Sequence, residues 1–443
     1  DPLLAKKYAE MAAADEATRP RALKLLEQLR PAPPQRSLTP TVSIEPSAPP
    51  VSPRVVRADL DLGTIPPRST EEGQLLEQLK GGSVPAGRSL IQQLEERPQR
   101  SNDLVTVCRH LTGLLPGDSW CLEKLQSAAL ADRNPGYARA VEHVLQIARG
   151  AAQSIEPPPL SEQSEQPESV RAMLLRDSVD SAAEALALLW EGAEHVFRRD
   201  PNVYGVTGLE RVVLGAPSPL ARMVSTAARA LGLTRVPVFH RRDSSAVTIN
   251  VALLSPPALI VSGEMRQETP EFSFHIGAML TATLPCFVLL FGLPEGELQS
   301  ILDALMLAFG PPRPAQTSKQ PAVSLAEVLW ESIPVRSQRR SREVCDRVEG
   351  FSYGSLLASS RHALHRAGLF VCGDLRIAVR EASHDAGLDA EAMREPSGLA
   401  RLCAASPAVT DLVLLATSPI YAETRWQPAR AGQRKQSGGW SAG

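Results

Sequence analysis

The stretch TPEFSFHIGAMLTATLP occupies residues 269–285 and follows PPALIVSG (256–263), an apolar run that predicts a β-strand. Thr269 is suited to cap a helix and Pro270 to occupy its first position. A strand followed by a capped apolar helix is where many zinc peptidases carry an HExxH motif. This helix has one histidine, His275, and no acidic residue after it. The question is whether it is a former catalytic helix or only core.

The composition excludes some classes of function. With 47 basic and 49 acidic residues among 443, the chain has no overall charge to attract nucleic acid or an anionic membrane. The six cysteines are scattered without CxxC spacing, which predicts reduced thiols and a cytoplasmic protein. The most apolar window, 274–293, is interrupted by His275 and Pro285, so we expect it to be buried in protein rather than to span a membrane.

Breaks in composition divide the chain into alternating helical segments and linkers. Because it opens with Asp1 rather than Met, the first helical segment is consistent with the end of a longer repeat array. The predicted order is a helical segment (1–30), a proline-rich linker (31–70), a helical repeat-like block (71–150), a second linker (151–169), an α+β domain (170–425) and a disordered basic tail (426–443).

Periodicity and breakers place the elements of the later region. An amphipathic helix is expected over 218–233, and short strands over 235–240, 245–254 and 256–263. Helices are then predicted by apolar periodicity over several further ranges, namely 294–310, 323–333, 339–348, 353–380 and 396–404. The predicted fold class is therefore mainly α with a small β-sheet.

The block 71–150 consists of short helices separated by Gly, Pro and Asp. The phrase AALADRNPGYARAVEHVL (128–145) resembles the paired helices of tetratricopeptide-type repeats, whose units bury their faces only against neighbours. No regular repeat period is visible in the sequence, so a plain helical bundle remains an equal alternative.

The order of elements from about 205 to 380 resembles half of a zincin domain, as in zinc metallopeptidases of the HtpX and CAAX prenyl protease type. Three segments carry the resemblance: SPLARMVSTAARALGLTRVPVF (218–239), PPALIVSGEM (256–265) and SSRHALHRAGLFVCGDL (359–375). The last is similar to the family's ExxxD helix, whose first acid is the third zinc ligand. Together with the upstream helices, the arrangement resembles large bacterial repeat proteins that carry a degenerate domain of this kind.

The resemblance implies which positions would bind zinc, and these positions lack suitable ligands. Ala278 and Ala282 stand where the two histidines belong, and Met279 stands where the glutamate belongs. On the second helix, Arg361 replaces the ligand acid and His365 replaces the aspartate. Methyl and thioether groups do not coordinate zinc as imidazole does, and a guanidinium repels it. We therefore expect a degenerate site, with no metal and no other cofactor.

Two alternatives do not depend on this motif. His362 and His365 are three apart and, with His275, form a candidate three-histidine metal site. The cluster RSQRRSR (336–342) offers four arginines for an anionic partner or nucleic acid, although acidic residues follow it at once and a solvated helix start explains it as well. The arginines of this cluster are Arg336, Arg339, Arg340 and Arg342.

Isolated reactive residues have simpler interpretations. Glu264 and Glu268 are suited to act as a general base but also as surface charges before a helix. Asp374 follows Gly373 and is typical of a turn between helices. Cys372 has no neighbouring histidine and acid in the sequence, which favours a buried structural thiol over a nucleophile.

The sequence favours a non-catalytic scaffold, built on helical repeats and a pseudopeptidase domain, that docks a protein or peptide partner. The first alternative is a metal-dependent peptidase or hydrolase that uses the three histidines. The second is a nucleic-acid-binding adaptor that uses the basic cluster. Partner identity and oligomeric state are not encoded in any pattern of the chain.

Overall fold

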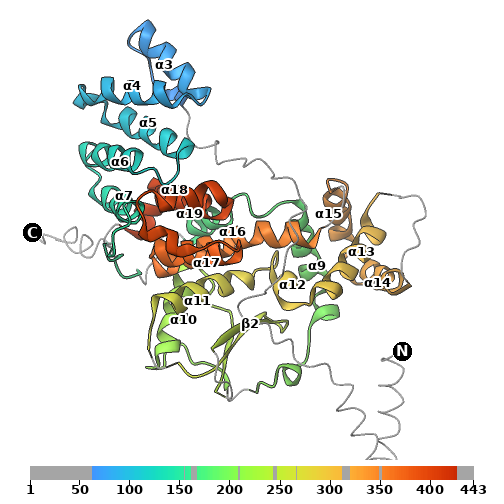
Figure 1. The fold of residues 1–443 in the computed structure, drawn as a ribbon. Helices are drawn as coiled ribbons and strands as arrows, with labels where there is room; N and C mark the ends of the chain where they lie inside the picture. The colour runs from blue at the N-terminus through green and yellow to red at the C-terminus, as the bar shows by residue number, and fades with distance from the viewer. Residues whose placement is uncertain are drawn as a thin grey trace, which may run out of the picture.

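The computed structural model describes residues 62–153, 155–160, 167–207, 210–242, 247–265, 267–311, 320–348 and 352–426. The predicted segment 1–30, the proline-rich stretch up to residue 61 and the tail from residue 427 lie outside these ranges. Within them the chain is mainly helical with one small mixed sheet, which confirms the predicted fold class (Figure 1). No helix of the described ranges combines the length and apolarity needed to cross a bilayer.

The first five described α-helices stack one upon the next (Figure 1). Side-chain caps at Ser69, Ser83, Asp118 and Asn134 start four of them, because each accepts a hydrogen bond from an otherwise unpaired backbone N–H of the first turn. The helices are α3 (Thr70–Lys80), α4 (Val84–Glu95), α5 (Ser101–Leu114), α6 (Ser119–Ala131) and α7 (Pro135–Ala148).

The end of the first predicted linker belongs to the core. Leu62 and Ile65 are buried, and the Arg100 guanidinium donates a hydrogen bond to the Pro66 carbonyl at 3.2 Å. The last residues of the predicted linker, 62–69, thus pack against the helical block, and α3 begins at residue 70.

The sheet has the order β1-β3-β2, with β1 (Val238–Arg241) parallel and β2 (Thr248–Ala252) antiparallel to the central β3 (Ala258–Ser262). Next to β1 the Val212 N–H donates to the Val238 carbonyl at 2.7 Å, so this edge is partly covered. Among the described residues, no strand pairs with the outer edge of β2. Within the described ranges, β2 therefore has a strand neighbour on one side only.

Two helices cross beside the sheet at close range: α11 (Pro270–Ala282) and α16 (Tyr353–Cys372). Gly368 lies against the Phe274 ring, where an added Cβ would meet ring carbons at 2.5 Å. Gly277 lies against Val371 in the same way, with 2.7 Å to a methyl carbon. Because both glycines lack a side chain, the two helix backbones approach closely.

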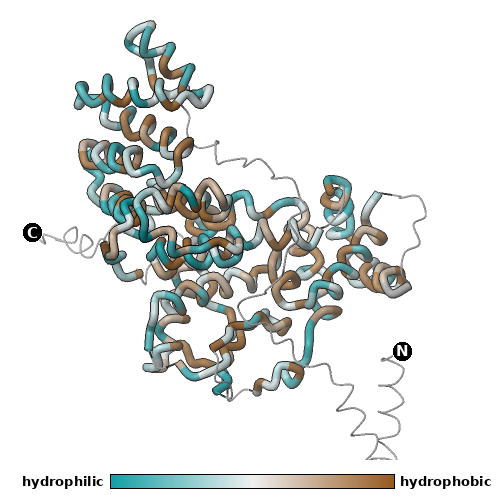
Figure 2. The backbone as a smooth tube through the Cα atoms, in the orientation of Figure 1, coloured by the Kyte–Doolittle hydropathy of each residue, from teal (hydrophilic) through white to brown (hydrophobic). Residues whose placement is uncertain are grey.

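The remaining helices pack against this pair or against one another, and apolar and polar stretches alternate along them, as expected for helices with one buried face (Figure 2). They are α8 (Pro167–Leu175), α9 (Ser181–Phe197), α10 (Pro219–Ala230), α12 (Val288–Gly292), α13 (Glu295–Phe309), α14 (Gln320–Ser332), α15 (Val335–Cys345), α17 (Leu375–Asp385), α18 (Gly398–Ala405), α19 (Pro407–Ala416) and α20 (Pro419–Arg425). Short 3₁₀ turns occupy Leu62–Thr64, Pro98–Arg100, Pro201–Tyr204 and Ala390–Arg394.

The helical block and the later region share one continuous apolar core. The Tyr137 hydroxyl of α7 donates to the Thr417 carbonyl at 2.8 Å, and the Ser397 N–H donates to the Ala148 carbonyl at 3.2 Å. Between the two parts, the extended segment 155–160 is held by bonds from its Ile155 backbone to α7 at 2.8 and 2.9 Å. The second predicted linker is thus a packed segment over these residues.

Candidate functional site

A cavity of about 240 Å³ lies beside β2, between α11, α16 and α17. Four of the five positions that the sequence analysis assigned to a degenerate metal site line it: Ala278, Met279, Arg361 and His365. Ile249, Asn250 and Val251 of the edge strand form one wall. The two segments that carried the predicted motif are therefore brought together in space, next to the open edge of the sheet.

The cavity face of α11 is made by Phe274, His275, Ala278 and Met279; the last two follow His275 by three and four residues and so share its side of the helix. Ala282 is fully buried and does not line the cavity. One further helical turn carries this position past the cavity into the core, so it lies apart from the other four. In its place the structure adds His275, which the sequence analysis had considered only in the alternative site.

Two carboxylates of α17, which the sequence analysis did not select, complete the cavity. Asp385 lies 3.2 Å from His365 Nε2 and 3.5 Å from Arg361 Nε. Glu381 lies 3.7 Å from His275 Nε2. Their spacing of four residues in REASHD was the available signal, since i,i+4 places both on one helical face.

Burial and neighbouring charges set the protonation of this cluster. Burial lowers the pKa of His275, and Arg380 and His365 act in the same direction against the raising effect of Glu381 and Asp385. The imidazole is therefore neutral at pH 7. Burial raises the pKa of the Asp385 carboxyl, but its hydrogen bond to His365 and the charges around it outweigh burial and hold the pKa below its usual range.

His362 does not join the cavity. Its Nδ1 lies 3.4 Å from a carboxylate oxygen of Asp411 on α19, so it points to a different neighbour than His365 does. The candidate three-histidine site of His275, His362 and His365 is not brought together, because a separation of three residues places their side chains against different helices. Within the described part of the chain, no three His, Cys, Asp or Glu side chains are arranged to hold a metal ion.

The basic cluster forms the start of α15, and most of its arginines have partners within the chain. Arg340 forms an ion pair with Glu184 of α9, and Arg339 lies 3.1 Å from Glu343. Arg342 lies over the Trp330 ring at 4.9 Å from its centroid. Arg336 is exposed at the first turn. These contacts attach α15 to α9 and α14, and they leave few arginines for an external anion.

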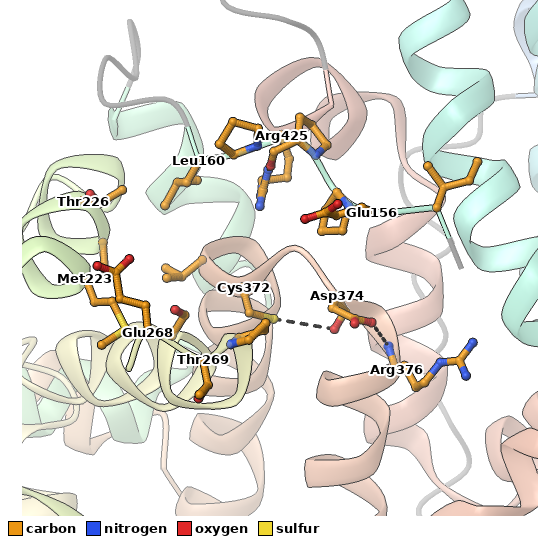
Figure 3. A pocket seen from close by; sticks show the side chains of 18 of the residues that line it. Glu156, Leu160, Met223, Thr226, Glu268, Thr269, Cys372, Asp374, Arg376 and Arg425 are labelled. Carbon is orange, nitrogen blue, oxygen red and sulfur yellow. Dashed lines mark hydrogen bonds between the residues drawn. The ribbon is translucent and has the colours of Figure 1, made fainter. Parts of the chain in front are cut away.

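A second cavity of about 790 Å³ lies at the other end of α16, and Cys372 and Asp374 face it (Figure 3). Asp374 caps α17 by accepting the Arg376 N–H at 2.8 Å, as a turn residue would. Burial raises the pKa of the Cys372 thiol to about 12, so it is not a thiolate at neutral pH. Glu268 is engaged by Arg222 at 2.6 Å. These groups have structural partners rather than catalytic ones.

All six cysteines are free and buried. Comparisons of the chain with family models, with curated proteins and with solved structures gave no match.

Proposed function

We propose that the chain is a non-catalytic scaffold that binds an extended peptide segment of a partner along the open edge of β2, with one peptide side chain entering the adjacent 240 Å³ cavity. The observation that carries this proposal is the coincidence of an unpaired strand edge and a cavity at the same place. Backbone hydrogen bonds along the edge supply affinity in this mode, and the cavity supplies specificity.

The chemistry of the cavity supports binding rather than hydrolysis. Ala278 and Met279 present a methyl and a thioether where a hydrolase would need an imidazole and a general base. Arg361 and His365 both face Asp385, so the strongest charges in the cavity already have partners. These pairings leave a cavity whose charged groups neutralise one another, which supports a binding role.

The open edge of β2 supports the same proposal. A strand edge exposes backbone N–H and C=O groups that pair readily with another extended chain. The end of β2 is fixed by Leu253, whose N–H donates to the Tyr204 hydroxyl at 2.9 Å and whose carbonyl accepts the Arg199 N–H at 2.8 Å. A rigid edge of this kind requires little reorganisation on binding.

The test is selection of peptides from a random display library with the purified chain, followed by affinity measurement by fluorescence anisotropy. Ala278→Leu fills the cavity and is expected to weaken the selected peptides at least tenfold. Ala131→Leu, the same change at an exposed position of α6, serves as the matched control and is expected to leave affinity unchanged. Equal affinities for both variants would remove the cavity from the proposal.

Metal analysis of the purified protein separates this proposal from the hydrolase alternative. Stoichiometric zinc that is lost in a His275→Ala, His365→Ala double variant would favour an enzyme over a scaffold. For the nucleic-acid alternative, binding with a steep dependence on salt that is lost when Arg339 and Arg340 are neutralised would be required.

A further inference from the structure

A third cavity lies where the helical block meets the later helices. We name it the junction cavity; its volume is about 630 Å³. Its walls come from α5, α8, α16, α19 and the start of α20, so it exists only because segments distant in sequence pack together. This volume is within the range of small-molecule sites, roughly 300–1,000 Å³. It is separate from the cavity beside β2, and no described residue lines both.

The lining of the junction cavity is largely apolar. Ala172 and Met173 come from α8, Leu414 and Leu415 from α19, and Ile420 from α20. Ile420 is 43% exposed although it is a large apolar side chain. An apolar surface of this size is favourable for a molecule that can remove it from water.

Three arginines and one carboxylate stand among these apolar residues. Arg366 is engaged by Asp411 through two hydrogen bonds, one of 2.7 Å, and so is neutralised. Arg176 lies 3.6 Å from Asp177. Arg109 is half-buried and forms no hydrogen bond or ion pair with any other described residue. Counted over the described residues alone, the lining of the cavity therefore has one cation in excess.

An apolar cavity with one unpaired cation is complementary to one class of ligand. We propose that the junction cavity binds a single-chain amphiphile, with an apolar chain against α8 and α19 and a carboxylate headgroup paired with Arg109. A partly desolvated guanidinium forms strong, charge-assisted bonds with a carboxylate. A neutral apolar ligand would cover the same surface but leave Arg109 without a counter-charge, which is costly.

The proposal concerns a site independent of the peptide-binding site, so either stands if the other fails. The experiment is isothermal titration of the full chain with dodecanoate and, separately, with dodecan-1-ol, which has the same chain without the charge. We expect dodecanoate to bind at least tenfold more tightly than the alcohol. Arg109→Gln is expected to weaken dodecanoate about tenfold and to leave the alcohol unchanged.

Two further variants keep the test decisive. Arg149→Gln on the exposed surface of α7, where Arg149 pairs with Glu123, is the matched control and is expected to bind like the parent chain. Ala172→Trp places an indole in the cavity and is expected to abolish binding of both ligands. Equal affinity for acid and alcohol, or no measurable binding of dodecanoate, would overturn the proposal. Binding only of a short apolar peptide with a free C-terminal carboxylate would also overturn it, in favour of a chain-end receptor.

Discussion

The two sides of α16 carry the same chemistry in different surroundings. On each side, one arginine and one histidine four residues apart hold one aspartate of a neighbouring helix, because i,i+4 residues share a face. The two sets are Arg361, His365 and Asp385 on the side of the cavity beside β2, and His362, Arg366 and Asp411 on the side toward α19.

The sets differ in distance and burial. Arg366 donates two hydrogen bonds to Asp411, one of 2.7 Å, and the two side chains are 7% and 11% exposed. Arg361 lies 3.5 Å from Asp385, and their side chains are 20% and 24% exposed. Both sets border a cavity. The same residue types thus form a tightly paired, buried connection on the side toward α19 and a looser, partly solvated cluster on the side of the cavity beside β2. Residue type alone does not separate a structural ion pair from a binding surface.

The largest effect is expected when the ion pair of Arg366 and Asp411 is broken. Arg366→Met leaves Asp411 buried without its main counter-charge, and we expect the free energy of unfolding in urea to fall by about 3–5 kcal/mol. Arg361→Met, the matched change on the cavity side, is expected to cost about 1 kcal/mol or less. The double variant Arg366→Met, Asp411→Leu should recover most of the loss. Similar losses for the two single variants would contradict the difference between the two sides.

The next largest loss of stability is expected at the crossing of α11 and α16, which positions the cavity beside β2. Gly368→Ala brings a methyl group onto the Phe274 ring, and we expect a loss of about 1–3 kcal/mol from overpacking, measured in the same way. The control is Gly296→Ala on α13, where an added Cβ meets no atom within 4 Å. That variant is expected to be as stable as the parent or slightly more so. If Gly368→Ala cost no stability, the close approach of α11 and α16 would not be required.

Local signals predicted the elements, and long-range packing decided the site. Thr269 and Pro270 fixed the start of α11 because capping depends only on neighbouring residues. The expected helix over 353–380 is broken at Gly373, whose φ of 75° ends α16. The two helices after residue 406 were not predicted.

The residues of the candidate site divide in the same way, into those that local signals predict and those that long-range packing brings in. Arg361 and His365 were identified from a motif position, and they do line the cavity. Glu381, Asp385 and Asp411 were not identified, because the partner of each lies 20 or more residues away along the chain. The three-histidine prediction assumed that residues three apart on a helix face the same neighbour. On α16, only residues four apart share a carboxylate: Arg361 with His365, and His362 with Arg366.

Acid titration tests the same comparison of the two sides, and its expected effect on stability is smaller. Burial raises the pKa of Asp411, but the hydrogen bonds and charges of His362 and Arg366 outweigh it, so the pKa is lowered in the fold. Its stabilising contribution is present above the unfolded pKa of about 3.9 and is lost as pH falls through the folded value. The stability difference between the parent chain and Asp411→Asn should therefore narrow below about pH 4. A difference that stays constant down to pH 2 would mean that shape, rather than charge, stabilises this side.

The smallest effect concerns His275 on the cavity side. Because burial lowers its pKa in the fold, the unfolded chain takes up a proton first as pH falls below about 6.5. The folded state then loses stability until His275 itself is protonated, at which point its pairing with Glu381 limits the loss. His275→Gln should remove this part of the slope as pH falls below about 6.5, whereas His195→Gln on α9 leaves the cavity unaltered and should keep it. If both variants kept the parent's dependence of stability on pH, the charges on the cavity side would be solvated and independent of one another. A bound peptide, rather than the fold, would then have to order these side chains.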